Sequence, residues 1–89
     1  DARRRAERTR ALGPLRKRVQ ELEASIEALE SRQRQHNLAL ADPALYDDPK
    51  RRDALLTEYQ ADSARLGELT DAWELAQAEL EQAQAELPE

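Results

Sequence analysis

The sequence contains no cysteine, no methionine, only two glycines, and three aromatic residues among its 89 positions. Without cysteine and with a single histidine, it cannot assemble a zinc site of the usual ligands or a thiol nucleophile. The two glycines lie outside any glycine-rich loop, which excludes a P-loop or a dinucleotide-binding turn. We therefore expect no catalytic site, no metal and no cofactor in this chain, and a role in binding or structure instead.

A signal peptide and long apolar runs are also missing. No stretch approaches the roughly 20 apolar residues that a membrane-spanning helix requires, so we expect no membrane contact. The absence of cysteine and of a signal peptide fits a reducing compartment and predicts a cytoplasmic location. Eighty-nine residues allow one small domain, and the missing initiator methionine indicates a piece of a longer protein.

Charge is distributed unevenly along the chain. Residues 1–20 hold eight Arg or Lys against two acids, a net charge of +6, whereas residues 21–89 carry −11, so the total is −5 at pH 7. Such asymmetry can mark an arm that binds nucleic acid. It can equally allow one part of the chain to pair with another.

Apolar residues recur at alternating steps of three and four, the spacing of a coiled-coil seam. The first seam comprises Leu12, Leu15, Val19, Leu22, Ile26, Leu29, Gln33, His36 and Leu40. The second comprises Leu55, Tyr59, Asp62, Leu66, Leu69, Trp73, Ala76, Leu80, Ala83 and Leu87. Two seams joined by a short polar loop predict an all-α fold, an antiparallel two-helix coiled-coil hairpin.

Proline and aspartate mark the expected ends of the elements. Pro14 suits the first position of a helix, and Asp48 suits the N-cap of the next one. Asp42 precedes another proline and predicts a short helical turn over 43–46 at the tip, while Pro88 ends the second helix. We expect a basic linker or lead-in segment over 1–13 and a hairpin domain over 14–88, with a helix over 14–41, a tip over 42–48 and a helix over 49–87.

The N-terminal segment leaves two alternatives open, a frayed linker or a helix that continues through Pro14 with a kink. In an antiparallel hairpin the basic start of the first helix lies beside the acidic end of the second. Arg16, Lys17 and Arg18 can then meet Glu79, Glu81 and Glu86, each exposed pair contributing about 0–1 kcal/mol. A core of two helices is thin, so we expect modest stability and weak self-association.

Polar residues in the two seams predict the register. If paired positions sum to 95, Gln33 faces Asp62 and His36 faces Tyr59, so the polar interruptions fall together. Sliding by one heptad would place Asp62 against an apolar residue and leave its carboxylate poorly paired. We interpret this polar layer mainly as a register device; a pH switch through His36 is the alternative.

The segment "LADPALYDDPKRRDALL" resembles the C-terminal domain of Uup-type ABC-F ATPases. That family's hairpin turn reads roughly L-x-D-P-x-L-Y, matched here by Leu40, Asp42, Pro43, Leu45 and Tyr46. Its W-E-x-L stretch is matched by Trp73 and Glu74, with Ala76 at the last position. The helix before the tip offers Leu22, Ile26, Glu27, Leu29 and Glu30, with Glu23 where the family has proline.

The resemblance implies a domain appended to two ATP-binding cassettes, which would be partners within the parent chain. It also implies binding of nucleic acid, chiefly DNA, and action on or near ribosomes, so that ribosomal or transfer RNA are further possible targets. A protein-interaction hairpin that docks on another protein or self-associates is the second interpretation. The RNA-gripping arms of tRNA synthetases, which share the architecture but not this turn, are the third.

Two basic clusters are the candidates for phosphate binding. The first consists of Lys50, Arg51 and Arg52, in the first turn of the second helix, where cations oppose the helix dipole. Binding of a phosphate ligand would explain basic residues at this position. A solvated turn of mixed charge is the alternative explanation. The second cluster joins Arg3, Arg4, Arg5, Arg8 and Arg10 to Arg16, Lys17 and Arg18, with pairing inside the chain as its alternative. Arg32 and Arg34, with Arg65 near Arg32, extend a basic face along the hairpin.

Leu45 and Tyr46 are expected to cap the tip end of the seam. Tyr46 could instead stack on a nucleobase, and Trp73 is expected to be a seam residue rather than a ligand contact. An isoelectric point near 4.9 is low for a strong DNA-binding domain. We therefore predict weak, salt-sensitive, sequence-independent binding through local patches, directed by the tip.

Overall fold

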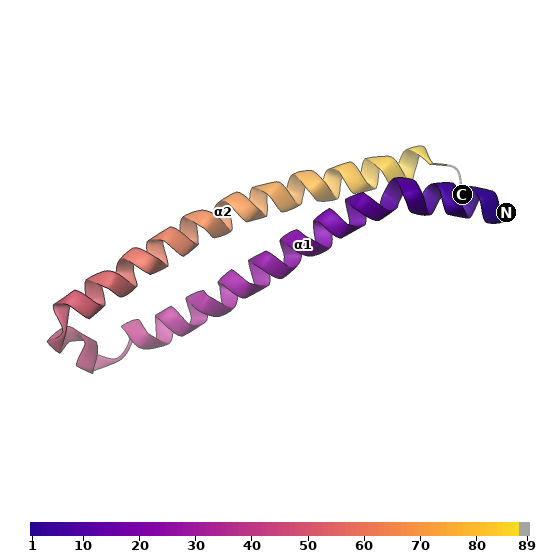
Figure 1. Cartoon of the computed structure of the whole chain (residues 1–89). Coiled ribbons are helices and arrows are strands. Elements are labelled where there is room, and N and C mark those ends of the chain that lie inside the picture. Colours follow the sequence, from indigo (N-terminus) through magenta and orange to yellow (C-terminus); the bar gives the residue numbers. More distant parts are fainter. Residues whose placement is uncertain (88–89) are drawn as a thin grey trace.

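Three aspartates begin the helical elements of the structure, a computed structural model that describes residues 1–87. The carboxylates of Asp1, Asp42 and Asp48 accept backbone N–H hydrogen bonds of 2.9, 3.0 and 3.2 Å. Each bond satisfies an N–H group that the first turn of a helix leaves without a partner. The elements are α1 (Ala2–Leu40), the 3-10 helix η1 (Pro43–Asp47) and α2 (Pro49–Glu86) (Figure 1).

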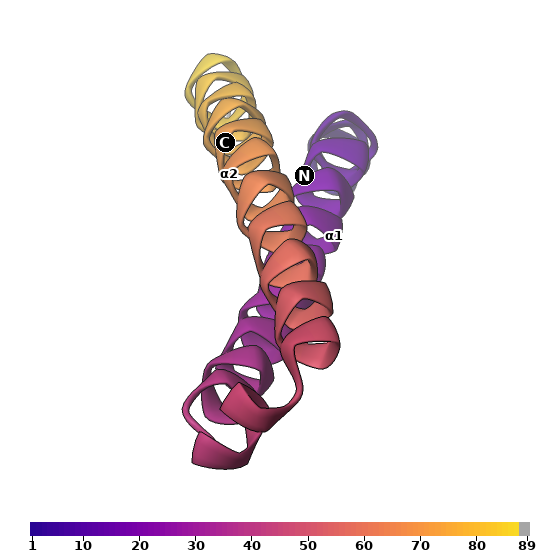
Figure 2. The same ribbon diagram turned by 90° about the vertical axis from the view of Figure 1, so that its left-hand side faces the viewer.

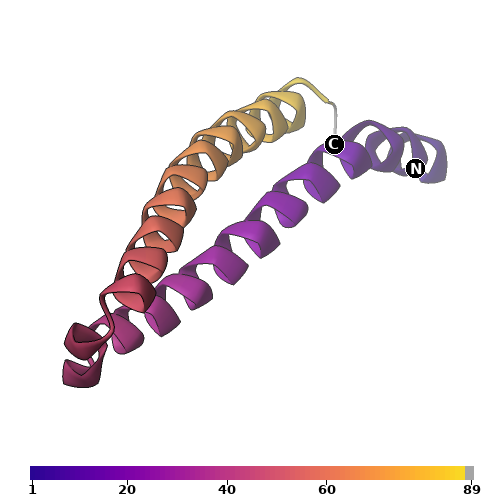
Figure 3. The ribbon, with the colours of Figure 1, turned by 60° about the vertical axis from the view of Figure 1, so that its left-hand side comes forward.

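The first helix does not begin at Pro14, which corrects that expectation. α1 runs through Pro14, the second of the two alternatives for the N-terminal segment. Leu12 is fully buried at 0% exposure, and the Arg8 guanidinium donates a 3.2 Å hydrogen bond to the carbonyl of Leu87. These contacts offset the hydrogen bond lost because proline has no N–H. Figures 1 and 3 show the N-terminal part of α1 at an angle to the rest.

The tip contains the short helical turn that the sequence predicts, now extended by one residue to Asp47. The N-cap role of Asp48 is also confirmed. α1 ends one residue earlier than expected. α2 ends at Glu86 because the backbone of Leu87 is extended, with ψ at 134°, while its N–H still donates to the carbonyl of Ala83. The role expected for Pro88 lies outside the described residues.

The two helices lie antiparallel along their length and cross one another (Figures 1 and 2), which confirms the all-α hairpin. Their core lies toward the base, the end that holds the N-terminus and Leu87. Its buried members are Leu12, Val19, Leu22, Leu69, Ala76 and Leu80. Between Leu22 and Leu69 the only side chain classed as buried is that of Leu45, at the tip. The base of the hairpin is therefore better packed than its outer half.

Contacts between the helices confirm the predicted register to within one residue. The Gln33 side-chain amide donates a 2.8 Å hydrogen bond to the hydroxyl of Ser63, the neighbour of Asp62. The Asp62 carboxylate instead lies 3.2 Å from the Nε of Arg32. The imidazole of His36 lies 3.4 Å from Glu58 and 3.8 Å from Asp62. A polar layer of these six residues thus separates the base from the outer half.

The hairpin is a rod of 67 × 18 × 14 Å. Its radius of gyration is 19.8 Å, against the roughly 12 Å expected for a globular domain of this length. Neither α1 nor α2 has a stretch apolar enough to cross a bilayer, over the residues that the structure describes.

The ion pairs expected between the two ends of the hairpin are not formed. Over residues 1–87, Arg16, Lys17 and Arg18 make no ion pair with α2, and Lys17 instead lies 3.9 Å from Glu21 on its own helix. Two of the acids expected as partners likewise bond within α2, Glu81 with Gln77 and Glu86 with Gln82. The apolar seam brings the helices together, while these exposed charges stay on the solvent side of each helix and reach neighbours one turn away.

Candidate nucleic-acid interface

The tip cluster, defined as Lys50, Arg51 and Arg52, occupies the first turn of α2 because Asp48 and Pro49 start the helix immediately before it. Lys50 and Arg51 are exposed and Arg52 is half-buried. The Nε of Arg52 lies 3.7 Å from the carboxylate of Asp53, in an exposed pair that solvent weakens. All three basic side chains can therefore reach a ligand that approaches the end of the rod.

Acidic residues reduce the charge of the tip. Residues 42–53 contain three basic and four acidic residues, a net charge of −1. Two of these acids, Asp42 and Asp48, are directed to the backbone N–H groups of Ala44 and Arg51. The positive charge at this end is therefore local, which fits weak and salt-sensitive binding of an anion.

Leu45 and Tyr46 have opposite environments, so only half of the capping prediction is correct. Leu45 is buried, at 6% exposure, and closes the tip end of the hairpin as expected. Tyr46 is 66% exposed and does not cap the seam. It lines a hollow of about 340 Å³ at the tip, together with Leu40, Leu45, Arg52 and Leu56.

The other basic residues singled out in the sequence do not join the tip cluster. Arg16, Lys17 and Arg18 are exposed in the basic half of α1, toward the base of the rod. Arg8, from the same half, is held by the carbonyl of Leu87. The N-terminal basic segment is thus a helical surface at the far end from the tip cluster.

Arg32 and Arg34 do not form the continuous basic face that the sequence suggested. They lie two residues apart on α1, and such residues do not share a face of a helix. Arg32 is held by Asp62 in the polar layer, and Arg65 pairs with Glu68 at 3.1 Å on its own helix. The basic residues are therefore divided among the tip, the middle and the base.

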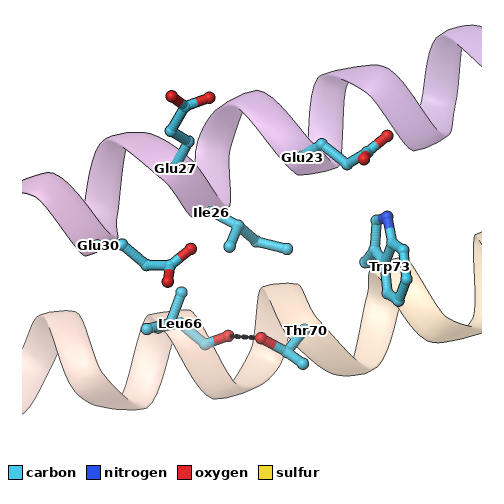
Figure 4. A pocket seen from close by; sticks show the side chains of 7 residues that line it. All are labelled: Glu23, Ile26, Glu27, Glu30, Leu66, Thr70 and Trp73. Atoms are coloured by element: carbon cyan, nitrogen blue, oxygen red, sulfur yellow. Dashed lines mark hydrogen bonds between the residues drawn. The ribbon is translucent and has the colours of Figure 1, made fainter.

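A groove of about 530 Å³ lies midway along the hairpin (Figure 4). Ile26 and Leu66 lie between the helices there, and Trp73 stands on α2 near Glu23. The full lining is Glu23, Ile26, Glu27, Glu30, Leu66, Thr70 and Trp73. Trp73 also packs against the core, as expected for a seam residue. Three carboxylates and no basic residue make this groove unsuitable for a phosphate backbone.

Sequence reasoning missed the partners within the polar layer. It paired Gln33 with Asp62, whereas Ser63 and Arg32 are the partners, and it did not include Glu58 beside His36. A heptad rule considers only the seam positions. A long side chain beside the seam, such as that of Arg32, can reach around the helix to a seam carboxylate.

The tip cluster lies within the part of the chain that matches a known protein family. The family described as ABC transporter C-terminal domain matches residues 14–77, which include the tip, the polar layer and Trp73. Neither the search of curated proteins nor that of solved structures found a match for this chain. The matched region covers most of the hairpin, and the chain belongs to the ABC transporter C-terminal domain family, the C-terminal domains of ABC-F type ATPases.

Proposed function

We propose that this chain is the nucleic-acid-binding appendage of a cytoplasmic ABC-F ATPase. It binds weakly and without sequence preference through the tip cluster and makes no catalytic contribution of its own. DNA is the first target, and ribosomal or transfer RNA the second. The observation that carries the proposal is the run of three basic residues, two exposed and one half-buried, at the end of a rod 67 Å long.

Two features of the site support this assignment. Cations in the first turn of a helix oppose its dipole, so a phosphate ligand supplies a reason for their presence. The tip is also narrow, because the rod is only 18 × 14 Å in section. It can therefore approach the backbone of a duplex while the acidic groove remains at a distance.

The test compares two sets of charge reversals on the 89-residue chain. One variant carries Lys50→Glu, Arg51→Glu and Arg52→Glu, and its matched control carries Arg16→Glu, Lys17→Glu and Arg18→Glu. Fluorescence anisotropy with labelled duplex DNA and with a structured RNA, at low and moderate salt, measures Kd. We expect the tip variant to lose binding and the control to keep it.

The salt dependence gives a second measure. Three phosphate contacts predict a slope of about −2.7 for log K against log salt with duplex DNA. Binding that survives reversal of the tip cluster but not of the control cluster would move the site to the base. An absence of binding at low salt would refute the proposal.

The acidic groove supports a second candidate function, a hairpin that docks on protein. Its apolar floor and its three glutamates suit a basic, amphipathic segment such as one on the ATP-binding cassettes. Mixing the chain with its own cassettes and measuring association by sedimentation tests this function. Glu23→Lys with Glu27→Lys should weaken that association and leave nucleic-acid binding unchanged or stronger.

A further inference from the structure

The hollow at the tip has a composition that phosphate contacts do not explain. Its walls come from α1, η1 and α2, and all but one of its lining residues are apolar or aromatic: Leu40, Leu45, Tyr46, Arg52 and Leu56. Tyr46 and Leu56 remain 66% and 39% exposed. A volume of about 340 Å³ lies at the lower end of the range for small-ligand sites. The hollow is therefore large enough for one ring system and too small for a duplex.

Its chemistry fits a flat aromatic group attached to an anion. The exposed ring of Tyr46 offers a stacking surface, and the leucines offer apolar contact around it. The guanidinium of Arg52 belongs to the same hollow, with Lys50 and Arg51 beside it in the chain. A phosphate bound there would compete with the exposed pair between Arg52 and Asp53, which solvent weakens.

We propose that the hollow binds one unpaired nucleobase, while the tip cluster contacts the phosphates beside it. A base inside a duplex must first be unpaired and unstacked before it can enter, whereas a base in a bulge, a loop or a single strand is extruded at lower cost. The tip thus selects nucleic acid with an unpaired nucleotide over perfect duplex. This inference rests on the proposed function and names the substrate class of the same site.

The experiment uses three labelled duplexes with the same base-paired sequence: a perfect duplex, the duplex with a one-nucleotide bulge, and the duplex with an abasic bulge. Anisotropy titrations at low salt give Kd for the wild-type chain and for Tyr46→Ala, Tyr46→Phe and Leu38→Ala. Leu38 is the matched control, an apolar residue 76% exposed on α1 and outside the hollow. Circular dichroism verifies that each variant is folded.

We expect the wild type to bind the base-containing bulge about tenfold or more tightly than either other oligonucleotide, as one base–aromatic stack predicts. Tyr46→Ala should remove this preference and leave duplex affinity unchanged. Tyr46→Phe, which keeps the ring, and Leu38→Ala should retain it.

Four outcomes would overturn the inference. An abasic bulge bound as tightly as the base-containing one would show that the tip recognises flexibility rather than a base. If Tyr46→Ala lowers the affinity for the perfect duplex and for the base-containing bulge by the same factor, the tyrosine does not select for a base. If duplex binding depends on the tip cluster but the bulge gives no gain, the inference fails and the proposed function stands. If no oligonucleotide binds, both fail.

Discussion

At the scale of single residues, Leu12 distinguishes the two interpretations of the N-terminal segment. It precedes Pro14 in the chain and is nevertheless fully buried, at 0% exposure. Replacing a buried leucine by alanine removes packed atoms and leaves a cavity, at a cost of about 2–5 kcal/mol. We predict that Leu12→Ala lowers the free energy of unfolding by this amount, measured by urea denaturation followed by circular dichroism.

The control for this measurement is Leu38→Ala, which truncates a leucine 76% exposed on the same helix. Substitutions at such surface positions change stability by about 0.5 kcal/mol or less. Equal stability of the two variants would contradict a packed N-terminal helix and would favour the alternative interpretation, in which the N-terminal segment is a frayed linker.

Residue environments could be predicted where they depend on neighbours in sequence. The caps at Asp42 and Asp48 were predictable because a carboxylate reaches only the next two or three N–H groups. The exposure of Tyr46 was not, because it depends on the shape of η1. With three residues per turn in a 3-10 helix, neighbouring side chains point about 120° apart, so burying Leu45 turns Tyr46 outward.

At the scale of helices, the polar layer divides each helix into parts with different packing. Six buried side chains lie on the base side, whereas Leu45 is the one buried residue between Leu22 and Leu69. Segments with few buried apolar contacts open locally at lower free energy. We predict that amides of residues 29–40 and 55–66 exchange with deuterium faster than those of 15–26 and 69–80, measured by mass spectrometry.

Fast exchange in the outer half need not extend to the whole tip cluster, since the N–H groups of Arg51 and Arg52 are hydrogen-bonded to Asp48. Uniform protection along both helices would instead mean that the hairpin opens as a single cooperative unit, and that the polar layer creates no boundary.

The polar layer also gives a prediction about specificity. Replacing polar seam residues by apolar ones often stabilises a fold, by about 1–4 kcal/mol, while it weakens the preference for one register. We predict that Gln33→Leu with Asp62→Leu raises the melting temperature and produces a mixture of masses in light scattering, whereas the wild type gives one. A lower melting temperature would mean that the pairs with Arg32 and Ser63 stabilise the hairpin in their own right.

The helices were predictable in number, direction and register because the apolar spacing repeats over many turns. The uneven packing of the core, tighter near the base than near the tip, could not be predicted. Both seams are apolar near the tip as well as near the base, yet residues such as Leu40 and Leu55 remain only half-buried. Burial depends on how closely two helices approach at each point, and periodicity carries no information about that distance.

At the scale of the whole molecule, the rod shape itself can be measured. We predict a radius of gyration near 19.8 Å for the monomer in small-angle X-ray scattering, well above the roughly 12 Å of a compact domain. A compact value would contradict the extended hairpin. A rise of both mass and radius with concentration would reveal the self-association that a thin core favours.

The position of the two ends has a mechanical consequence. The N-terminus and Leu87 lie at one end of the rod, where Arg8 donates a hydrogen bond to the carbonyl of Leu87, and the tip lies at the other end (Figure 1). The hairpin is therefore a lever arm 67 Å long. If a body that grips its base rotated by about 15°, as subunits do in allosteric proteins, the tip would sweep an arc of about 17 Å. A small rotation at the base of the hairpin would thus produce a large displacement of Tyr46 and of the tip cluster.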